Sequence, residues 1–197
     1  MDALKAADAA PADAFDPADE LFVAQERRPP TLGAIALRDL SPYQRALLAI
    51  DGTVTRFVEA YCLEPVEVVR LAQAESCLAA ADEWLALSAG APVVRRRVML
   101  VGAGSGRFFA WADSIIAVAR AGAGIRQRLD EDAGGLGRII LDNALETRRE
   151  ALWFGRERPA DVPPPVAARW SDEFLTRTYR VLAGGVPLML ITERFPL

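Results

Sequence analysis

The sequence predicts an α+β fold in which helices pack on an antiparallel β-sheet. Two β-hairpins carry this prediction. Strand-like runs over 93–101 and 108–116 flank a glycine-rich loop, and two further runs flank Gly184 and Gly185 near the C-terminus. Consecutive glycines suit a two-residue hairpin turn, because both of its positions need a positive φ. Helical signals before and between the hairpins complete the α+β pattern.

The first helix has a clear start. Ser41 is a candidate N-cap and Pro42 stands at the first helical position, so we expect a helix that runs to about residue 50. Residues 53–58 follow as a short extended or helical segment. The other expected elements are a strand over 64–73, a helical turn around 79–87, helices over 126–132 and 143–154 with Arg148 and Arg149 on a solvated face, and a proline-rich loop over 156–169.

The chain is expected to divide into a leader and one domain. Its 197 residues are enough for a single domain with a sizeable core. Residues 1–39 are rich in alanine, proline and acidic side chains, a composition typical of disordered or irregular chain. We therefore expect the folded domain to span residues 40–197.

Charge and hydropathy exclude several classes of partner. Residues 1–20 carry a net charge of −5, so residues 21–197 carry only +1 and offer no basic field for nucleic acid or for a membrane surface. No apolar run approaches the roughly 18 residues of a membrane helix, and the acidic N-terminus is unlike a secretory signal. Cys62 and Cys77 lack CxxC spacing and are expected to be reduced thiols. These features predict a cytoplasmic protein without nucleic-acid or membrane partners, and they leave the oligomeric state open.

Missing residue types exclude much chemistry. The chain has no histidine, and its one lysine, Lys5, lies in the acidic leader. This excludes Ser-His-Asp and Cys-His nucleophile systems, histidine metal sites, P-loop phosphate binding and lysine Schiff bases in the domain. The glycine-rich loop over 102–107 joins two strands, which is the wrong context for a dinucleotide site. Any chemistry in the domain must use Glu, Asp, Arg, Tyr, Ser, Thr or Cys.

Charged side chains fall on apolar faces of the predicted strands. Because side chains alternate across a strand, Arg96, Asp113 and Glu193 each lie among apolar neighbours. A simple two-residue turn places Thr176 opposite Glu193 and puts Arg180 on the face of Glu193. We therefore expect a face that carries two arginines and two carboxylates, provided that the strand register, which the sequence does not determine, brings them together.

Such a face has more than one interpretation. A buried guanidinium needs an anionic partner, which is either a carboxylate of the protein or an anionic ligand. A carboxylate among apolar groups is costly to ionise, which suits proton transfer. The cluster thus predicts internal ion pairs of Arg96 and Arg180 with Asp113 or Glu193, a strand-end contact of Glu193 with water, or a pocket for a small, anionic and partly apolar ligand.

Five stretches occur in an informative order: LLAIDGTVTR at 47–56, VRRRVML at 94–100, FAWADSII at 109–116, LGRII at 136–140, and the run over 177–195. As an ordered set they resemble the chorismate pyruvate-lyase family, also called 4-hydroxybenzoate synthases, and especially its actinobacterial branch. The resemblance implies an antiparallel sheet that encloses its ligand in an internal pocket. It also implies cleavage of chorismate into 4-hydroxybenzoate and pyruvate without a cofactor or a metal.

The resemblance also implies roles for individual residues. Arg96 matches the family arginine that holds the ring carboxylate, and Glu193 matches the glutamate that faces the 4-oxygen. Backbone amides near Val54 and Leu136 match those that help to hold the carboxylate. Arginines suit a dianionic substrate, and a glutamate in a dry pocket suits proton transfer to the leaving oxygen.

One departure concerns the second carboxylate of chorismate. Asp113 stands where the enterobacterial branch has an arginine, and in this respect the chain is similar to the actinobacterial branch. Arg180 or Arg56 is then expected to bind the enolpyruvyl carboxylate.

The sequence therefore predicts a carbon–oxygen lyase with Arg96 and Glu193 as its catalytic residues and chorismate as its small-molecule substrate. Two alternatives stay open. One is a non-catalytic module that binds small acids, similar to the effector domains of some bacterial transcription regulators, although residues 1–39 are too short for the DNA-binding domain of such regulators. The other is a lyase that forms a different hydroxybenzoate for a natural-product pathway.

Overall fold

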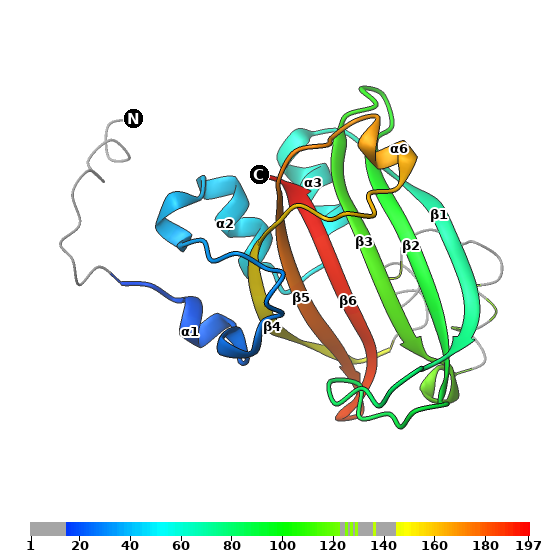
Figure 1. Ribbon diagram of the computed structural model, residues 1–197. Coiled ribbons are helices and arrows are strands. Elements are labelled where there is room, and N and C mark those ends of the chain that lie inside the picture. Colours follow the sequence, from blue (N-terminus) through cyan, green and yellow to red (C-terminus); the bar gives the residue numbers. More distant parts are fainter. Residues whose placement is uncertain (1–14, 123–124, 126, 128, 130–135, 137–144) are drawn as a thin grey trace, which may run out of the picture.

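One six-stranded antiparallel sheet organises the protein (Figure 1). The computed structural model describes residues 15–122, 125, 127, 129, 136 and 145–197. The strands lie in the order β1-β2-β3-β6-β5-β4, which confirms the α+β class and both predicted hairpins. They are β1 (Val66–Cys77), β2 (Pro92–Gly102), β3 (Phe108–Ala117), β4 (Thr147–Glu157), β5 (Phe174–Ala183) and β6 (Val186–Pro196). The helices are α1 (Ala18–Leu21), α2 (Pro42–Ala49), α3 (Val54–Cys62) and α6 (Pro164–Ala167), with 3₁₀ turns η1 (Gln25–Arg27), η2 (Leu37–Asp39) and η3 (Val118–Arg120).

α2 begins as the sequence predicts, with Ser41 as its N-cap and Pro42 at its first position. The Ser41 hydroxyl accepts a hydrogen bond from the Gln44 amide, and the Gln44 side chain accepts one from the Ser41 amide. This reciprocal capping box satisfies two backbone donors that a helix N-terminus otherwise leaves unpaired. The segment over 53–58 is helical rather than extended, because it opens α3.

Helices cover both faces of the sheet, and each layer has its own core. In Figure 1, α3 lies behind the sheet and α6 lies in front of it, so we call these the far face and the near face. Val54 and Val58 of α3 belong to the same buried cluster as Leu100 of β2. On the near face, Val166 of α6 joins the cluster that contains Trp111 of β3. The candidate site lies on the far face.

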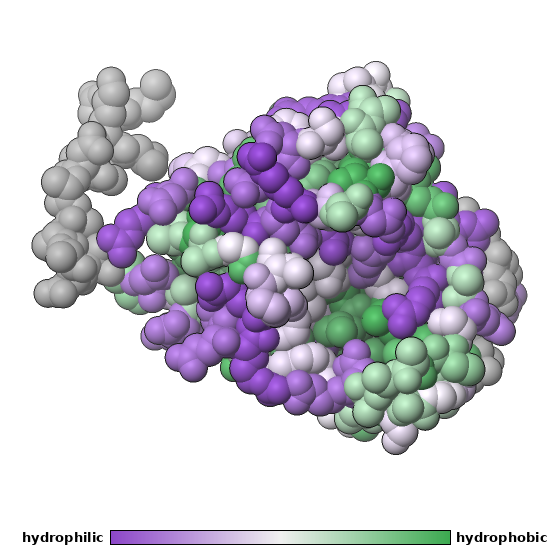
Figure 2. All heavy atoms as spheres, viewed as in Figure 1, coloured by the Kyte–Doolittle hydropathy of each residue, from purple (hydrophilic) through white to green (hydrophobic). Residues whose placement is uncertain are grey.

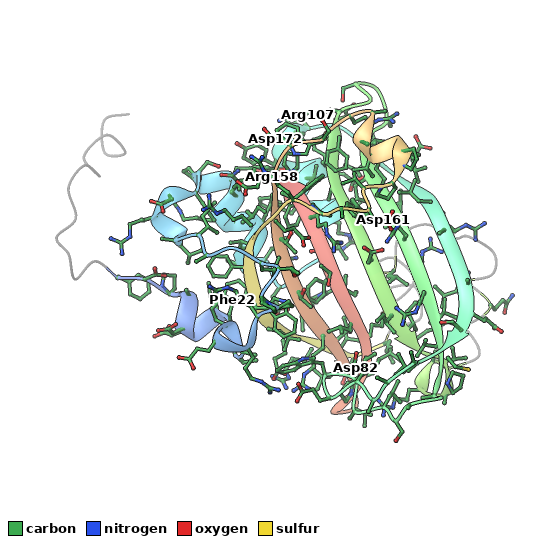
Figure 3. All side chains as sticks on the ribbon, in the orientation of Figure 1. Phe22, Asp82, Arg107, Arg158, Asp161 and Asp172 are labelled. Carbon is green, nitrogen blue, oxygen red and sulfur yellow. The ribbon has the colours of Figure 1, made fainter. Side chains whose placement is uncertain are left out.

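The described part of the leader packs along β4. Phe22 is 2% exposed, and its ring centroid lies 4.7 Å from that of Phe154 (Figure 3). Backbone hydrogen bonds join residues 23–24 to 151–152 and residue 33 to 156, so they cover the outer edge of β4. The division into a leader over 1–39 and a domain over 40–197 stays a prediction, and residues 1–14 lie outside the described residues.

Gly155 marks the closest approach of the leader to β4. A Cβ atom at Gly155 would lie 2.7 Å from the backbone oxygen of Gly33, which is too close without movement of one strand. We expect Gly155→Ala to lower the free energy of unfolding by roughly 1–3 kcal/mol in urea denaturation. Gly122→Ala is the matched control, since a Cβ there meets no described residue within 4 Å. Equal free energies for both variants would contradict this close packing.

The helix predicted over 143–154 is wrong. From Thr147 onward this segment is β4, which pairs with β5, while residues 143 and 144 lie outside the described residues. Alanine, leucine, glutamate and arginine favour a helix locally, but pairing with β5 and burial against the leader outweigh that weak preference.

Two smaller predictions also differ from the structure. β1 continues to Cys77 instead of ending at residue 73. The segment over 79–87 forms no helical turn; it is an irregular loop closed by backbone pairing of Asp82 with Leu87. The helix predicted over 126–132 falls largely outside the described residues.

Candidate functional site

A cavity lies on the far face of the sheet, beside the N-terminus of α3. Its walls are mainly aliphatic side chains, with a small number of polar groups among them. This composition is typical of sites that bind small organic molecules. The polar lining consists of Thr53, Thr55, Arg96, Ser114, Arg149, Tyr179 and Glu193.

Glu193 is the buried carboxylate of this cavity. Its side chain is 10% exposed, and each of its oxygens has a fixed donor. Arg177 Nε donates to Oε2 at 2.8 Å, and the Tyr179 hydroxyl donates to Oε1 at 3.1 Å. Two donors, one of them cationic, fix the orientation of the carboxylate, and each oxygen keeps a lone pair that can accept a further hydrogen bond.

Arg177, not Arg180, faces Glu193 across the last hairpin. The register pairs Arg177 with Glu193, one residue away from the predicted Thr176. The cause is a β-bulge next to the turn, in which Leu188 is the extra residue of β6. A bulge shifts the pairing by one residue, and a shift of one residue sends the side chains of β5 to the opposite faces. The predicted places of Thr176 and Arg180 are therefore wrong.

Arg177 also connects the site to α2. Its Nη1 donates to the backbone oxygens of Leu48 and Ile50, each at 3.1 Å. Its side chain is 3% exposed, and its guanidinium lies 5.1 Å from the ring centroid of Tyr179. One arginine thus orients Glu193 and fixes the end of α2 against the sheet.

Arg180 lies on the near face, outside the cavity. It forms an ion pair with Glu150 at 2.5 Å and donates to the backbone oxygen of Trp84. Arg56 is exposed on α3 and does not line the cavity either. Neither arginine is therefore placed to meet a ligand beside Glu193, contrary to the prediction.

Asp113 is also on the near face, because it pairs across the sheet with Arg97 and Thr192. Its carboxylate accepts from Arg97 at 2.6 Å and from Arg194 at 2.8 Å. Asp113, Arg97 and Thr192 border a second hollow, and the near face is the one turned toward the viewer in Figure 2. The expectation that Asp113 shares a face with Arg96 and Glu193 is wrong, and its charge is satisfied by two arginines.

Arg96 lies where strand alternation places it. The residue is 3% exposed and lines the cavity with Val98 and Leu100. Its Nη1 donates to Gln73 Oε1 at 2.6 Å. The structure thus brings Arg96 and Glu193, from β2 and β6, to one cavity, as the sequence predicts.

The N-terminus of α3 supplies a further anion-attracting feature. Val54 and Leu136 both line the cavity, as expected. Thr53 is the N-cap residue, but its side chain does not cap the helix, and its buried hydroxyl has no hydrogen-bond partner among the described residues. Free backbone amides and the positive end of the helix dipole favour an anion here.

Arg149 is a charged lining residue that the sequence did not predict. It lies on β4 opposite Val181 and faces the cavity, whereas a solvated helix face was expected. An assignment of this segment as a strand would have placed Arg148 and Arg149 on opposite faces and so revealed the inward arginine.

Tyr179 gives the site a pH dependence. Burial, together with the charge of Glu193, raises the pKa of the Tyr179 phenol above its ordinary value of about 10. A raised pKa in the folded state means that stability is fully present below the pKa of the unfolded chain, near 10, and is lost as pH rises through the folded value.

We therefore expect Tyr179→Phe to destabilise the protein by roughly 1.5–3 kcal/mol at pH 7, because it removes a hydrogen bond to a charged group. Above about pH 10 the wild type should lose this advantage, so the difference between the two proteins should shrink. Urea denaturation at pH 7 and at pH 11 measures both differences. A difference that stays constant between the two pH values would contradict the assignment.

Two kinds of feature are absent from the described part of the chain. There, no group of three or more His, Cys, Asp or Glu side chains is arranged to hold a metal ion. The described helices include none that has the length and apolar character needed to cross a membrane.

Every lining residue of the cavity falls within the part of the chain that matches a known protein family. Residues 48–197 match the family described as "Chorismate pyruvate-lyase Rv2949c-like". The chain belongs to this family. A protein of Mycobacterium tuberculosis (strain H37Rv) named chorismate pyruvate-lyase is 30% identical over 169 residues, which cover 81% of this chain and 82% of that protein. One of the same name from Mycobacterium leprae (strain TN) is 28% identical over 171 residues, which cover 84% and 79%.

Several solved structures share the fold of this chorismate pyruvate-lyase family member. The effector domain of PhnF from Mycobacterium smegmatis superposes with a TM-score of 0.56 at 16% identity, covering 73% of this chain and 88% of that domain. In full PhnF the match has the same TM-score at 15% identity, and the chain spans 63% of that protein's length. The C-terminal domain of a histidine utilization repressor from Pseudomonas syringae gives a TM-score of 0.50 at 12% identity, covering 66% of this chain and 91% of that domain. At these identities the likeness concerns the fold alone.

Proposed function

We propose that this protein cleaves chorismate into 4-hydroxybenzoate and pyruvate without a cofactor. The observation that carries the proposal is the buried Glu193 carboxylate, oriented by Arg177 and Tyr179 in a cavity that also holds Arg96. Family membership and the names of the two mycobacterial relatives support the same reaction.

The reaction is an elimination that makes the ring aromatic. The carbon–hydrogen bond at the hydroxyl-bearing ring carbon breaks, and its electron pair becomes a ring double bond. The neighbouring ether carbon–oxygen bond breaks, and its electron pair leaves with oxygen as the enolate of pyruvate. The proton removed from the ring balances the proton that converts this enolate into pyruvate, so no oxidant or reductant is needed.

Glu193 is the group we assign to that proton transfer. A carboxylate held in place by two donors is positioned to accept the ring proton and then to return it to the leaving enolate. The aliphatic walls exclude water, which strengthens the electrostatic interactions of the charged groups.

We assign the ring carboxylate to Arg96 and to the backbone amides at the start of α3 and near Leu136. Guanidinium binds a carboxylate through two parallel hydrogen bonds, which restricts the orientation of the ring as well as its position. The uncapped N-terminus of α3 adds a positive end beside it.

The test is an incubation of the purified protein with chorismate, analysed by mass-resolved chromatography for the three hydroxybenzoate isomers and for pyruvate. We expect 4-hydroxybenzoate and pyruvate in equal amounts. A different isomer would support the alternative lyase. Chorismate that is bound but recovered intact would support the alternative of a binding module, for which the fold shared with the PhnF effector domain is the relevant observation.

We further propose a cytoplasmic enzyme without a nucleic-acid partner. The near-neutral charge of residues 21–197 offers no basic surface for nucleic acid. Cys62 and Cys77 are free thiols, and Cys77 is exposed, which suits a reducing compartment.

A further inference from the structure

Arg149 is a second arginine in the cavity to which the reaction described above gives no role. Its Nη1 donates to the backbone oxygen of Asp51 at 3.2 Å. Its buried Nε has no hydrogen-bond partner among the described residues. It also forms no ion pair with any described carboxylate, so its positive charge faces the cavity without an anion.

The other inward arginine near Glu193 already has an anionic partner in the protein. Arg177 uses Nε for the Glu193 carboxylate and Nη1 for the backbone oxygens of Leu48 and Ile50 at the end of α2. Of the two arginines that the sequence made candidates for the second carboxylate, Arg180 is paired with Glu150 on the near face and Arg56 is exposed on α3. A cation beside an apolar cavity is poorly solvated, which favours a site that takes an anion from the ligand.

The substrate of the proposed function has one more carboxylate than Arg96 can bind. Chorismate carries a ring carboxylate and an enolpyruvyl carboxylate, and burial of the second without a partner would be strongly unfavourable. Arg149 lies across the cavity on β4, whereas Arg96 lies on β2. The two strands are separated in the sheet order by the strands that carry Glu193 and Tyr179.

We propose that Arg149 binds the enolpyruvyl carboxylate of chorismate. This inference rests on the proposed function and adds a residue that distinguishes substrate from product. The two carboxylates would then be held from opposite sides, with the ring and its proton beside Glu193 between them. The charge of Arg149 also acts on the Tyr179 phenol, which supports its position close to the Glu193 end of the cavity.

A direct consequence is selective loss of affinity. The product 4-hydroxybenzoate keeps the ring carboxylate but lacks the enolpyruvyl carboxylate, so Arg149 should contribute to the binding of chorismate and not to that of the product. Arg96, by contrast, should contribute to both.

The experiment measures both ligands by titration calorimetry in the Glu193→Gln background, where chorismate is not consumed. We expect Arg149→Met to weaken chorismate binding about 10- to 100-fold, the range of a charge-assisted hydrogen-bonded pair, and to change the affinity for 4-hydroxybenzoate less than about twofold. Arg149→Lys keeps the charge without the planar fork, so its chorismate affinity should lie between those of the parent and of Arg149→Met.

Arg148→Met is the matched control. Arg148 precedes Arg149 on β4, its side chain is 67% exposed, and it pairs with Glu150 at 3.3 Å. Its loss removes the same charge from the protein without touching the cavity, so both affinities should stay unchanged.

The proposal would be overturned if Arg149→Met weakened the binding of both ligands equally. It would also be overturned if the variant kept its parent's melting temperature and its parent's affinity for chorismate. The outcome is separable from the proposed function, because the calorimetry reports binding whether or not the wild type turns chorismate over. Arg96→Met, which should weaken both ligands, verifies that the titration detects loss of a carboxylate contact.

Discussion

Glu193→Gln is expected to lower the turnover number for chorismate by about 10²- to 10⁴-fold, the range for loss of a positioned acid/base group. Glutamine has nearly the shape of glutamate. Its amide oxygen can accept from Arg177 and its amide nitrogen can donate to the Tyr179 hydroxyl oxygen, so the cavity should keep its geometry. It cannot accept the ring proton at neutral pH. Steady-state formation of 4-hydroxybenzoate gives the turnover number, and calorimetry gives the affinity for the product.

The split between turnover and affinity is the informative result. A catalytic role predicts that product affinity changes much less than turnover, because the proton is in transit only in the transition state. Glu157→Gln is the matched control. Glu157 accepts hydrogen bonds from Arg194 and Thr176 outside the cavity, so this variant also removes one carboxylate charge that is paired with an arginine. Unchanged turnover in Glu193→Gln would remove the acid/base role.

Arg177→Met is expected to produce the largest loss of stability, about 3–5 kcal/mol in the free energy of unfolding. The variant leaves the Glu193 carboxylate buried without its cation, and it also removes the donors to Leu48 and Ile50. Urea denaturation at pH 7 measures the effect. Methionine keeps most of the apolar volume of the arginine stem, so the cavity term stays small.

Two comparisons make this result specific to the buried pair. Arg158→Met breaks an ion pair with Asp172 in which the side chains are 73% and 71% exposed (Figure 3), and it should cost less than about 1 kcal/mol. In the double variant Arg177→Met/Glu193→Gln no uncompensated charge remains, so part of the lost stability should return. Additive losses in the double variant would show that the two side chains do not act as a pair.

The sequence could predict those features of the site that depend on side-chain alternation within a single strand. Arg96 and Glu193 each stand on an apolar face of a strand whose neighbours alternate clearly, and both line the cavity. The hairpin turn at Gly184 and Gly185 was equally local, and both glycines have a positive φ. Local patterns therefore identified the strands and the inward faces within them.

Relations between strands were the part that the sequence could not supply. The bulge at Leu188 depends on how β5 and β6 pair, and it exchanges Arg180 for Arg177. Asp113 was misplaced for a similar reason, since its neighbours across the sheet are known only once β3 pairs with β6. Arg149 was missed because tertiary pairing makes a strand of a segment whose composition favours a helix.

The contacts of Arg177 have a consequence for motion. A guanidinium is planar and rigid, so the atom that holds Glu193 and the atom that holds the end of α2 cannot move independently. The segment just after α2 leads into α3, whose first residue lines the cavity. A ligand that displaces the start of α3 should therefore also displace Glu193 on the other wall, so the two sides of the cavity should move together.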